Sequence, residues 1–197
     1  NDQDEEFTEQ TIAPQLAIYT GNEFTTRSGA HFTCPPELSY HLLSETVNAG
    51  FDVTRFDGLQ DGMLRAHAFG PVIERLTPEF DIPIVPVYVE SFRLPCPTPA
   101  RCYSFGQALA AAVESWPGDD RIAVIASGGI SHFPGSFPFK YTPNSPQALH
   151  GNVDHVYDRQ LFEYMKEGRN EELAKLSNQD LLDHGVPLLA RGAEHLI

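Results

Sequence analysis

The chain has 197 residues, of which 41% are hydrophobic, and this is enough apolar surface to bury the core of one globular domain. Its 13 basic and 27 acidic side chains give a net charge of -14, which disfavours binding to nucleic acid or anionic lipid. The sequence has no apolar run long enough to cross a membrane, and it begins with acidic residues rather than an export signal. Composition therefore argues against nucleic-acid and membrane partners.

The number and spacing of the cysteines indicate whether the protein forms disulfides and hence in which cellular compartment it is expected. Cys34, Cys96 and Cys102 are odd in number and show no paired Cys-x-x-Cys spacing. This pattern favours neither a disulfide framework nor a structural zinc site. We therefore expect a cytoplasmic protein in a reducing environment.

The first part of the chain predicts two strands and one helix. Residues 11–20 end in a short apolar run that predicts a strand, and residues 21–36 are typical of a long loop. Pro35 and Pro36, followed by apolar residues at helical spacing, predict a helix that stops at Gly50. Residues 51–56 then alternate as a strand does.

The second part predicts a crossover. The apolar runs at residues 82–88 and 122–126 predict two strands, and residues 103–116 between them have helical spacing. Two amphipathic helices are predicted near residues 154–167 and 170–184. Because a strand–helix–strand order implies a crossover, we expect an α/β fold: a single domain with a largely parallel or mixed central sheet flanked by helices.

The most informative segment is VIASGGISHFPG, residues 124–135, where a predicted strand leads into two glycines and then Ser131 and His132. In open α/β sheets, ligands bind outside the carboxyl ends of the strands, and glycines allow a ligand to approach the backbone closely. The spacing alone also fits a tight turn with a surface histidine. It does not fit the Gly-x-Ser-x-Gly motif of a nucleophile elbow.

The segment SGGISH resembles the signature of the class III extradiol dioxygenases, the superfamily of protocatechuate 4,5-dioxygenase beta subunits. Three further stretches resemble the same family in the same order: IPIVPVYVESF, PTPARCYSFGQAL and VDHVYDRQLFEYMKEG. This resemblance implies one catalytic domain over residues 1–197 that lacks its N-terminal and C-terminal ends. It also implies a non-haem iron(II) cofactor, and a catecholic substrate whose ring is opened with dioxygen beside the two hydroxyls.

The resemblance assigns roles to individual residues. His132 becomes the acid–base residue, which suits an imidazole because its ordinary pKa of about 6.5 allows proton exchange near neutral pH. Ser131, Asn1 and His67 become substrate-binding residues, and Glu194 becomes an iron ligand. By spacing alone, Glu194 would be an ordinary surface carboxylate, and His67 would be a histidine on a helix surface.

Two departures from the family pattern keep other functions open. Gln3 stands where the resemblance expects a histidine ligand, and the segment that carries the other histidine ligand would lie before Asn1. Because glutamine is a poor ligand for a transition metal, the alternative is a non-catalytic subunit or binding module with a degenerate metal site. A hydrolase on the same type of sheet rests on fold analogy alone.

The remaining expectations concern partners and the other histidines. We expect a catecholic substrate, dioxygen, and either a homo-oligomer or a small accessory subunit, whereas the sequence does not specify the ring substituents. The remaining histidines lack the spacing of a metal site and are predicted to be exposed or structural; they are His31, His41, His150, His155, His184 and His195.

Overall fold

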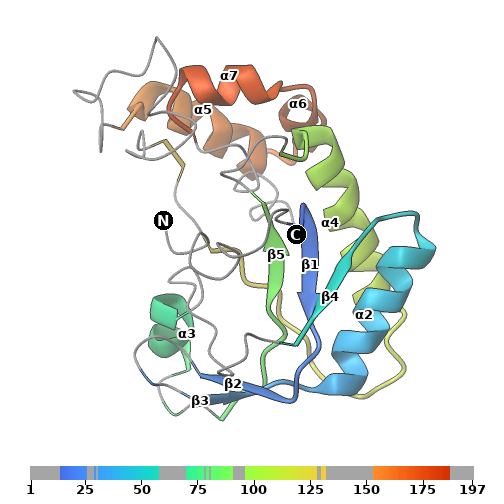
Figure 1. Cartoon of the computed structure of the whole chain (residues 1–197). Coiled ribbons are helices and arrows are strands. Elements are labelled where there is room, and N and C mark those ends of the chain that lie inside the picture. Colours follow the sequence, from blue (N-terminus) through green and yellow to red (C-terminus); the bar gives the residue numbers. More distant parts are fainter. Residues whose placement is uncertain are drawn as a thin grey trace. The chain divides into compact units, whose positions relative to one another are not determined.

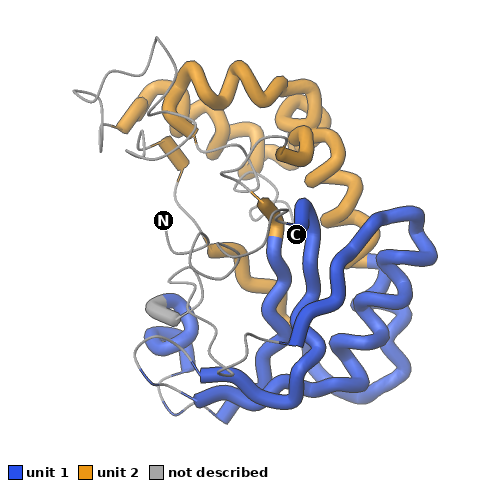
Figure 2. The backbone as a smooth tube through the Cα atoms, viewed as in Figure 1, with its two compact units in different colours: residues 1–88, 111–122 blue, residues 89–110, 123–197 orange. Residues whose placement is uncertain are grey.

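The computed structural model describes residues 14–25, 29, 31–57, 70–77, 79, 81–90, 96–127, 130–131 and 153–186. The chain forms two compact units, shown in different colours in Figure 2. Unit 1 comprises Asn1–Tyr88 and Ala111–Ile122, and unit 2 comprises Val89–Ala110 and Ala123–Ile197. The expectation of a single domain over residues 1–197 stays a prediction.

A three-stranded sheet contains β1 (Leu16–Tyr19), β4 (Thr54–Phe56) and β5 (Val87–Val89) in the order β4-β1-β5. Strands β1 and β4 are parallel, with Tyr19 opposite Phe56. A parallel pair needs a crossover, and α2 (Pro36–Asn48) lies on this connection and packs against β1 (Figure 1). The α/β fold class is therefore confirmed, together with the strands expected near residues 11–20 and 51–56.

Helix α2 forms where the sequence predicts a helix. Pro36 occupies its first turn, where a missing backbone N–H leaves no hydrogen bond unmade. The helix ends just before Gly50, whose φ of 91° lies in the left-handed region that other residues rarely adopt. The buried hydroxyl of Thr46 donates to the Leu42 carbonyl at 2.7 Å, so this polar group inside the helix is satisfied.

The loop predicted at residues 21–36 is wrong, because the segment contains a hairpin. Strands β2 (Glu23–Thr25) and β3 (His31–Thr33) pair antiparallel in a separate two-stranded sheet. Phe24 lies opposite Phe32, and the two buried rings stack with their centroids 5.3 Å apart. One buried phenylalanine in each strand thus provides the apolar contact that favours the hairpin over a loop.

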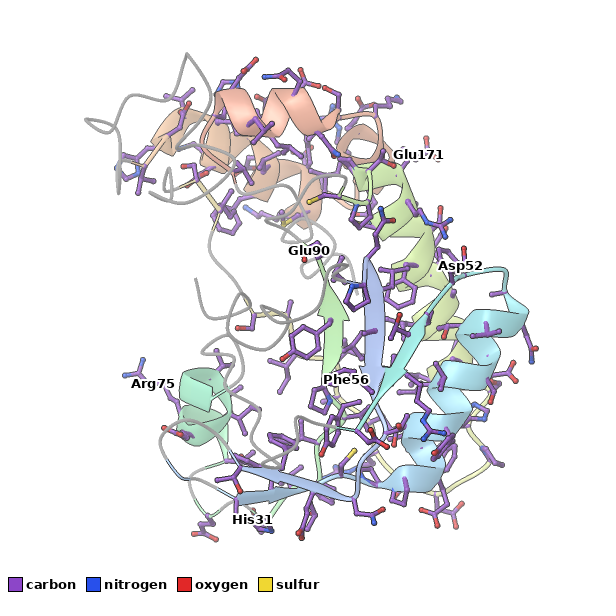
Figure 3. All side chains as sticks on the ribbon, viewed as in Figure 1. His31, Asp52, Phe56, Arg75, Glu90 and Glu171 are labelled. Atoms are coloured by element: carbon purple, nitrogen blue, oxygen red, sulfur yellow. The ribbon has the colours of Figure 1, made fainter. Side chains whose placement is uncertain are left out.

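The core of unit 1 is largely aromatic. The Tyr19 ring meets the rings of Phe24 and Phe56 edge-on, with centroid distances of 5.7 and 5.3 Å. Phe56, labelled on β4 in Figure 3, also meets Tyr88 edge-on at 5.1 Å. A short helix, α3 (Gly70–Leu76), for which the sequence predicts no bounds, adds the buried Ile73 to the same cluster.

The strand predicted at residues 82–88 begins later than expected, because β5 covers only Val87–Val89. Pro83 and Pro86 lack a backbone N–H, so they cannot donate to a sheet ladder. The Pro86 carbonyl still accepts a hydrogen bond from the Tyr19 N–H at 3.0 Å. Proline therefore shortens the strand while leaving its acceptor in use.

The strand predicted at residues 122–126 is wrong. Residues 121–127 form no helix or strand, and the side chains of Val124 and Ile125 are 47% and 55% exposed. The helix predicted before this segment does form, as α4 (Pro99–Glu114). The predicted crossover is therefore absent, because a short apolar run becomes a strand only when a neighbouring strand pairs with it.

Unit 2 contains α5 (His155–Lys166), α6 (Asn170–Ala174) and α7 (Asn178–Asp183), which lie close together in Figure 1. The helix expected at residues 154–167 is confirmed, whereas the one expected at 170–184 is two helices. A break occurs because Ser177 starts α7 with a capping box: its hydroxyl accepts from the Asp180 N–H, and the Asp180 carboxylate accepts from the Ser177 N–H.

The helices of unit 2 bury aliphatic side chains around Tyr157. Leu161, Leu173, Leu181 and Val186 form this cluster.

Within the described residues, no helix is long and apolar enough to span a bilayer.

Candidate functional site

Most of the predicted site residues fall outside the described part of the chain. These are Asn1, His67, His132 and Glu194; Gln3, which stands in place of an expected histidine ligand, also lies outside the described residues. Their roles stay predictions. Ser131 is described, and it is the starting point for the site because it directly precedes His132 in the sequence.

Ser131 is buried against the N-terminal turn of α5. Its backbone N–H donates to Asp158 Oδ1 at 3.0 Å, and its Oγ accepts from the Asp154 N–H at 2.7 Å. The residue is only 4% exposed. The role of Ser131 in substrate binding, which the family resemblance implies, stays a prediction. The structure shows that its hydroxyl oxygen already accepts a hydrogen bond from the protein.

Asp154 connects Ser131 to the start of α5 and to the end of α7. Its Oδ1 accepts from the Tyr157 N–H at 3.0 Å and caps the helix, while Oδ2 lies 2.8 Å from His184 Nδ1. The hydrogen bond from His184, followed by that from the Tyr157 N–H, holds the pKa of this carboxyl below its usual range. Asp154 is therefore ionised at neutral pH.

His184 is held in one orientation by two contacts. Asp154 binds its Nδ1, and the Tyr157 ring stacks on its imidazole with a centroid distance of 3.8 Å and an interplanar angle of 6°. The side chain is 41% exposed. The sequence analysis treated His184 as exposed or structural, because a partner 30 residues earlier in the chain leaves no local pattern to read.

Tyr157 lies at the centre of this arrangement. Burial, followed by the nearby carboxylate of Asp180, raises the pKa of its phenol to about 12, so the hydroxyl is protonated at neutral pH. Its oxygen has no hydrogen-bond partner among the residues that the structure describes. We call the five residues that surround the first turn of α5 the α5 polar cluster: Ser131, Asp154, Tyr157, Asp158 and His184.

The α5 polar cluster can hold polar groups in fixed orientations. The ionised Asp154 carboxylate beside Nδ1 fixes the orientation of the His184 ring. Within the described residues, no three side chains of His, Cys, Asp or Glu converge in a way that could hold a metal ion. The described residues therefore do not make a metal site, and the expected ligand Glu194 lies outside them.

Cys96 is not an activated nucleophile. Cys34, Cys96 and Cys102 are buried thiols that form no disulfide. Burial, followed by the charge of Glu90, raises the pKa of the Cys96 thiol to about 12, which keeps it protonated near neutral pH. Figure 3 shows Glu90 just beyond the end of β5.

Comparison with known families identifies the relatives of the chain. Residues 8–187 match the family described as the catalytic LigB subunit of aromatic ring-opening dioxygenase. The chain belongs to this family. The matched range includes the whole α5 polar cluster as well as His132 and His67, and this agrees with the resemblance inferred from SGGISH.

One relative is a gallate dioxygenase from Pseudomonas putida. The two chains are 38% identical over 97 residues, which cover 48% of this chain and 28% of the relative. The match thus spans less than a third of the length of that enzyme.

Proposed function

We propose that this protein opens a catechol-type aromatic ring with dioxygen by extradiol cleavage, with His132 as the acid–base residue. The observation that carries the proposal is the family match over residues 8–187, which spans most of the chain. A second support is the similarity to a gallate dioxygenase. Gallate and other catechols that carry a carboxylate are accordingly the first substrates to test.

The proposed role of His132 is proton transfer. Opening a catechol ring requires that a phenolic proton leave and that a proton later return to the product. An imidazole performs both transfers near neutral pH when it lies within hydrogen-bond reach of the substrate. The adjacent Ser131 is fixed to α5, which supports the proposal because a proton-transfer group must be held in place.

The proposal includes an iron(II) cofactor, with Glu194 as the ligand contributed by this chain. Iron would supply open coordination positions for the two substrate hydroxyls and for dioxygen. Asn1, His67 and Ser131 are proposed to contact the substrate. We also propose a homo-oligomer or an accessory subunit, and a reducing cytoplasm that keeps the three cysteines as thiols.

The decisive experiment replaces His132 in the full-length protein. We expect His132→Ala to lower the kcat for gallate or protocatechuate by roughly 10²- to 10⁴-fold, the usual effect of losing a general acid–base. Bound iron should stay unchanged. Oxygen uptake measures turnover, and metal analysis measures iron content. His155→Ala is the matched control, because this exposed histidine begins α5 and has no proposed role.

Two results would contradict this assignment. Loss of iron in His132→Ala would make the histidine a ligand rather than a proton-transfer group. A wild-type protein that takes up no oxygen with any catechol, even after anaerobic addition of iron(II), would instead support the second candidate function. That function is a non-catalytic subunit or binding module, and Gln3 in place of the expected histidine ligand favours it.

A further inference from the structure

Ser131 is held at two points by neighbouring parts of the chain. One contact uses its backbone N–H, which donates to Asp158 Oδ1, and the other uses its side-chain Oγ, which accepts from the Asp154 N–H. Because one anchor holds the backbone and the other holds the side chain, Ser131 cannot turn without breaking a hydrogen bond. Its burial excludes water as a ready replacement for either partner.

Asp158, whose carboxylate accepts the hydrogen bond from the Ser131 N–H, is part of a packed helix. Asp158 lies in the first turn of α5, and this helix buries Tyr157 and Leu161 against Leu173 and Leu181. Ile130, the residue before Ser131, packs against the same apolar cluster. A group held by a packed helix is placed more accurately than one held by a loop. Ile130 and Ser131 are therefore held in place by contacts with unit 2 residues.

His132 follows Ser131 by one peptide bond. Two glycines precede Ile130 in the sequence, and residues without a Cβ restrict the backbone least. Because the glycines leave the preceding backbone little restricted, the contacts of Ile130 and Ser131 contribute to the restraint on the chain that leads into His132. Among the described residues, the side-chain contact to the Ser131 backbone is the one from Asp158.

We propose that Asp158 is a positioning residue for His132: by holding the Ser131 N–H, it sets the orientation in which the imidazole meets the substrate. This inference rests on the proposed acid–base role of His132. Proton transfer requires hydrogen-bond distance, and a displacement of about 1 Å far from the chemistry can lower a rate by roughly 10²-fold. Asp158 itself need not contact the substrate.

The experiment compares two substitutions at Asp158 in the full-length protein. Asp158→Ala removes the acceptor, whereas Asp158→Asn keeps an oxygen that can accept from the Ser131 N–H but loses the charge. We expect Asp158→Ala to lower kcat by roughly 10- to 100-fold with a nearly unchanged KM. Asp158→Asn should recover most of the loss. Glu163→Ala is the matched control, because Glu163 is an exposed carboxylate later in the same helix.

A double-mutant cycle separates positioning from general damage to the fold. If Asp158 acts through His132, then Asp158→Ala should cause no further loss of kcat in a His132→Ala protein. An equal loss in both backgrounds, or an unchanged kcat in the single variant, would overturn the proposal. Circular dichroism and thermal unfolding check that each variant is folded.

A measurement without turnover distinguishes failure of this inference from failure of the proposed function. Hydrogen exchange of the Ser131 amide and the NMR shifts of the His132 imidazole report on the anchor directly. Both should change in Asp158→Ala and stay unchanged in Glu163→Ala. If the wild-type protein cleaves no catechol but these signals change in Asp158→Ala, Asp158 does position His132, whereas the proposed enzymatic role of His132 is wrong. If the signals stay unchanged in Asp158→Ala, Asp158 does not position His132, whatever the activity.

Discussion

In unit 1, aromatic rings on strands fill the interior, whereas in unit 2 three helices pack aliphatic side chains around a single buried tyrosine. Tyr19, Phe24, Phe32 and Tyr88 make edge-on or stacked contacts in unit 1. In unit 2, the buried Tyr157 ring stacks on His184, which Asp154 also binds. The two units therefore differ in what their cores do. Unit 1 gains stability from ring packing, and unit 2 places titratable groups at the edge of its core.

The largest expected effect tests the aromatic core. Phe24 is almost fully buried between Tyr19 and Phe32, so Phe24→Ala would remove two ring contacts and leave a cavity. We expect a loss of about 3–5 kcal/mol in the free energy of unfolding. Denaturant-induced unfolding, followed by circular dichroism, measures this change.

The matched variant in unit 2 is Leu181→Ala, because Leu181 is fully buried at the centre of the helical cluster. Hydrogen exchange resolved by residue should show Phe24→Ala weakening protection in unit 1 first and Leu181→Ala weakening it in unit 2 first. Loss of protection over the whole chain in both variants would show that the units unfold together. That outcome would support the single domain expected from the sequence and would contradict the idea that each core stabilises its own unit.

Local signals in the sequence predict helices α2, α4 and α5. Pro36 and Gly50 bound α2 because they act on their own backbone, and the sequence around Asp154 places the start of α5 correctly. The capping box of Ser177 and Asp180 marks the start of α7, but the apolar spacing of the sequence runs through Ser177 and therefore predicts one helix instead of two.

Strand pairing and the polar cluster depend on distant contacts, so the sequence predicts them less well. Residues 122–126 have the composition of a buried strand, yet they form none, because composition cannot show whether a partner strand lies alongside. The sequence analysis identified Ser131 beside His132. It could not show that Asp158, 27 residues later, holds the Ser131 backbone.

The next prediction concerns the cap of α7 and is smaller. Ser177→Ala removes the side-chain acceptor for the Asp180 N–H, while Leu181 and its packing are left in place. We expect a loss of about 1 kcal/mol in the free energy of unfolding, the usual effect of losing a helix N-cap. Ser177→Asp should recover much of this loss because aspartate also caps helices. A loss as large as that of Leu181→Ala would mean that the cap, rather than apolar packing, holds unit 2 together.

The smallest expected effect is the pH dependence that Asp154 gives to unit 2. Its pKa is lowered in the folded protein, first by the hydrogen bond from His184 and then by the Tyr157 N–H. A carboxyl with a depressed pKa stabilises the folded state above its unfolded pKa, and this contribution is lost as the pH falls through the folded pKa. The stabilisation should therefore be present at neutral pH and decline below the ordinary value of 3.8.

Asp154→Asn isolates this contribution, because asparagine also caps a helix but does not titrate in this range. We expect the wild-type protein to have the higher Tm at pH 6 and the difference from Asp154→Asn to shrink as the pH falls toward about 3. His184→Gln in the same series should reduce the difference at pH 6, since His184 is the largest cause of the lowered pKa. A difference in Tm that stays constant with pH would show that Asp154 acts as a neutral cap would, and the titratable character attributed to unit 2 would then rest on other groups.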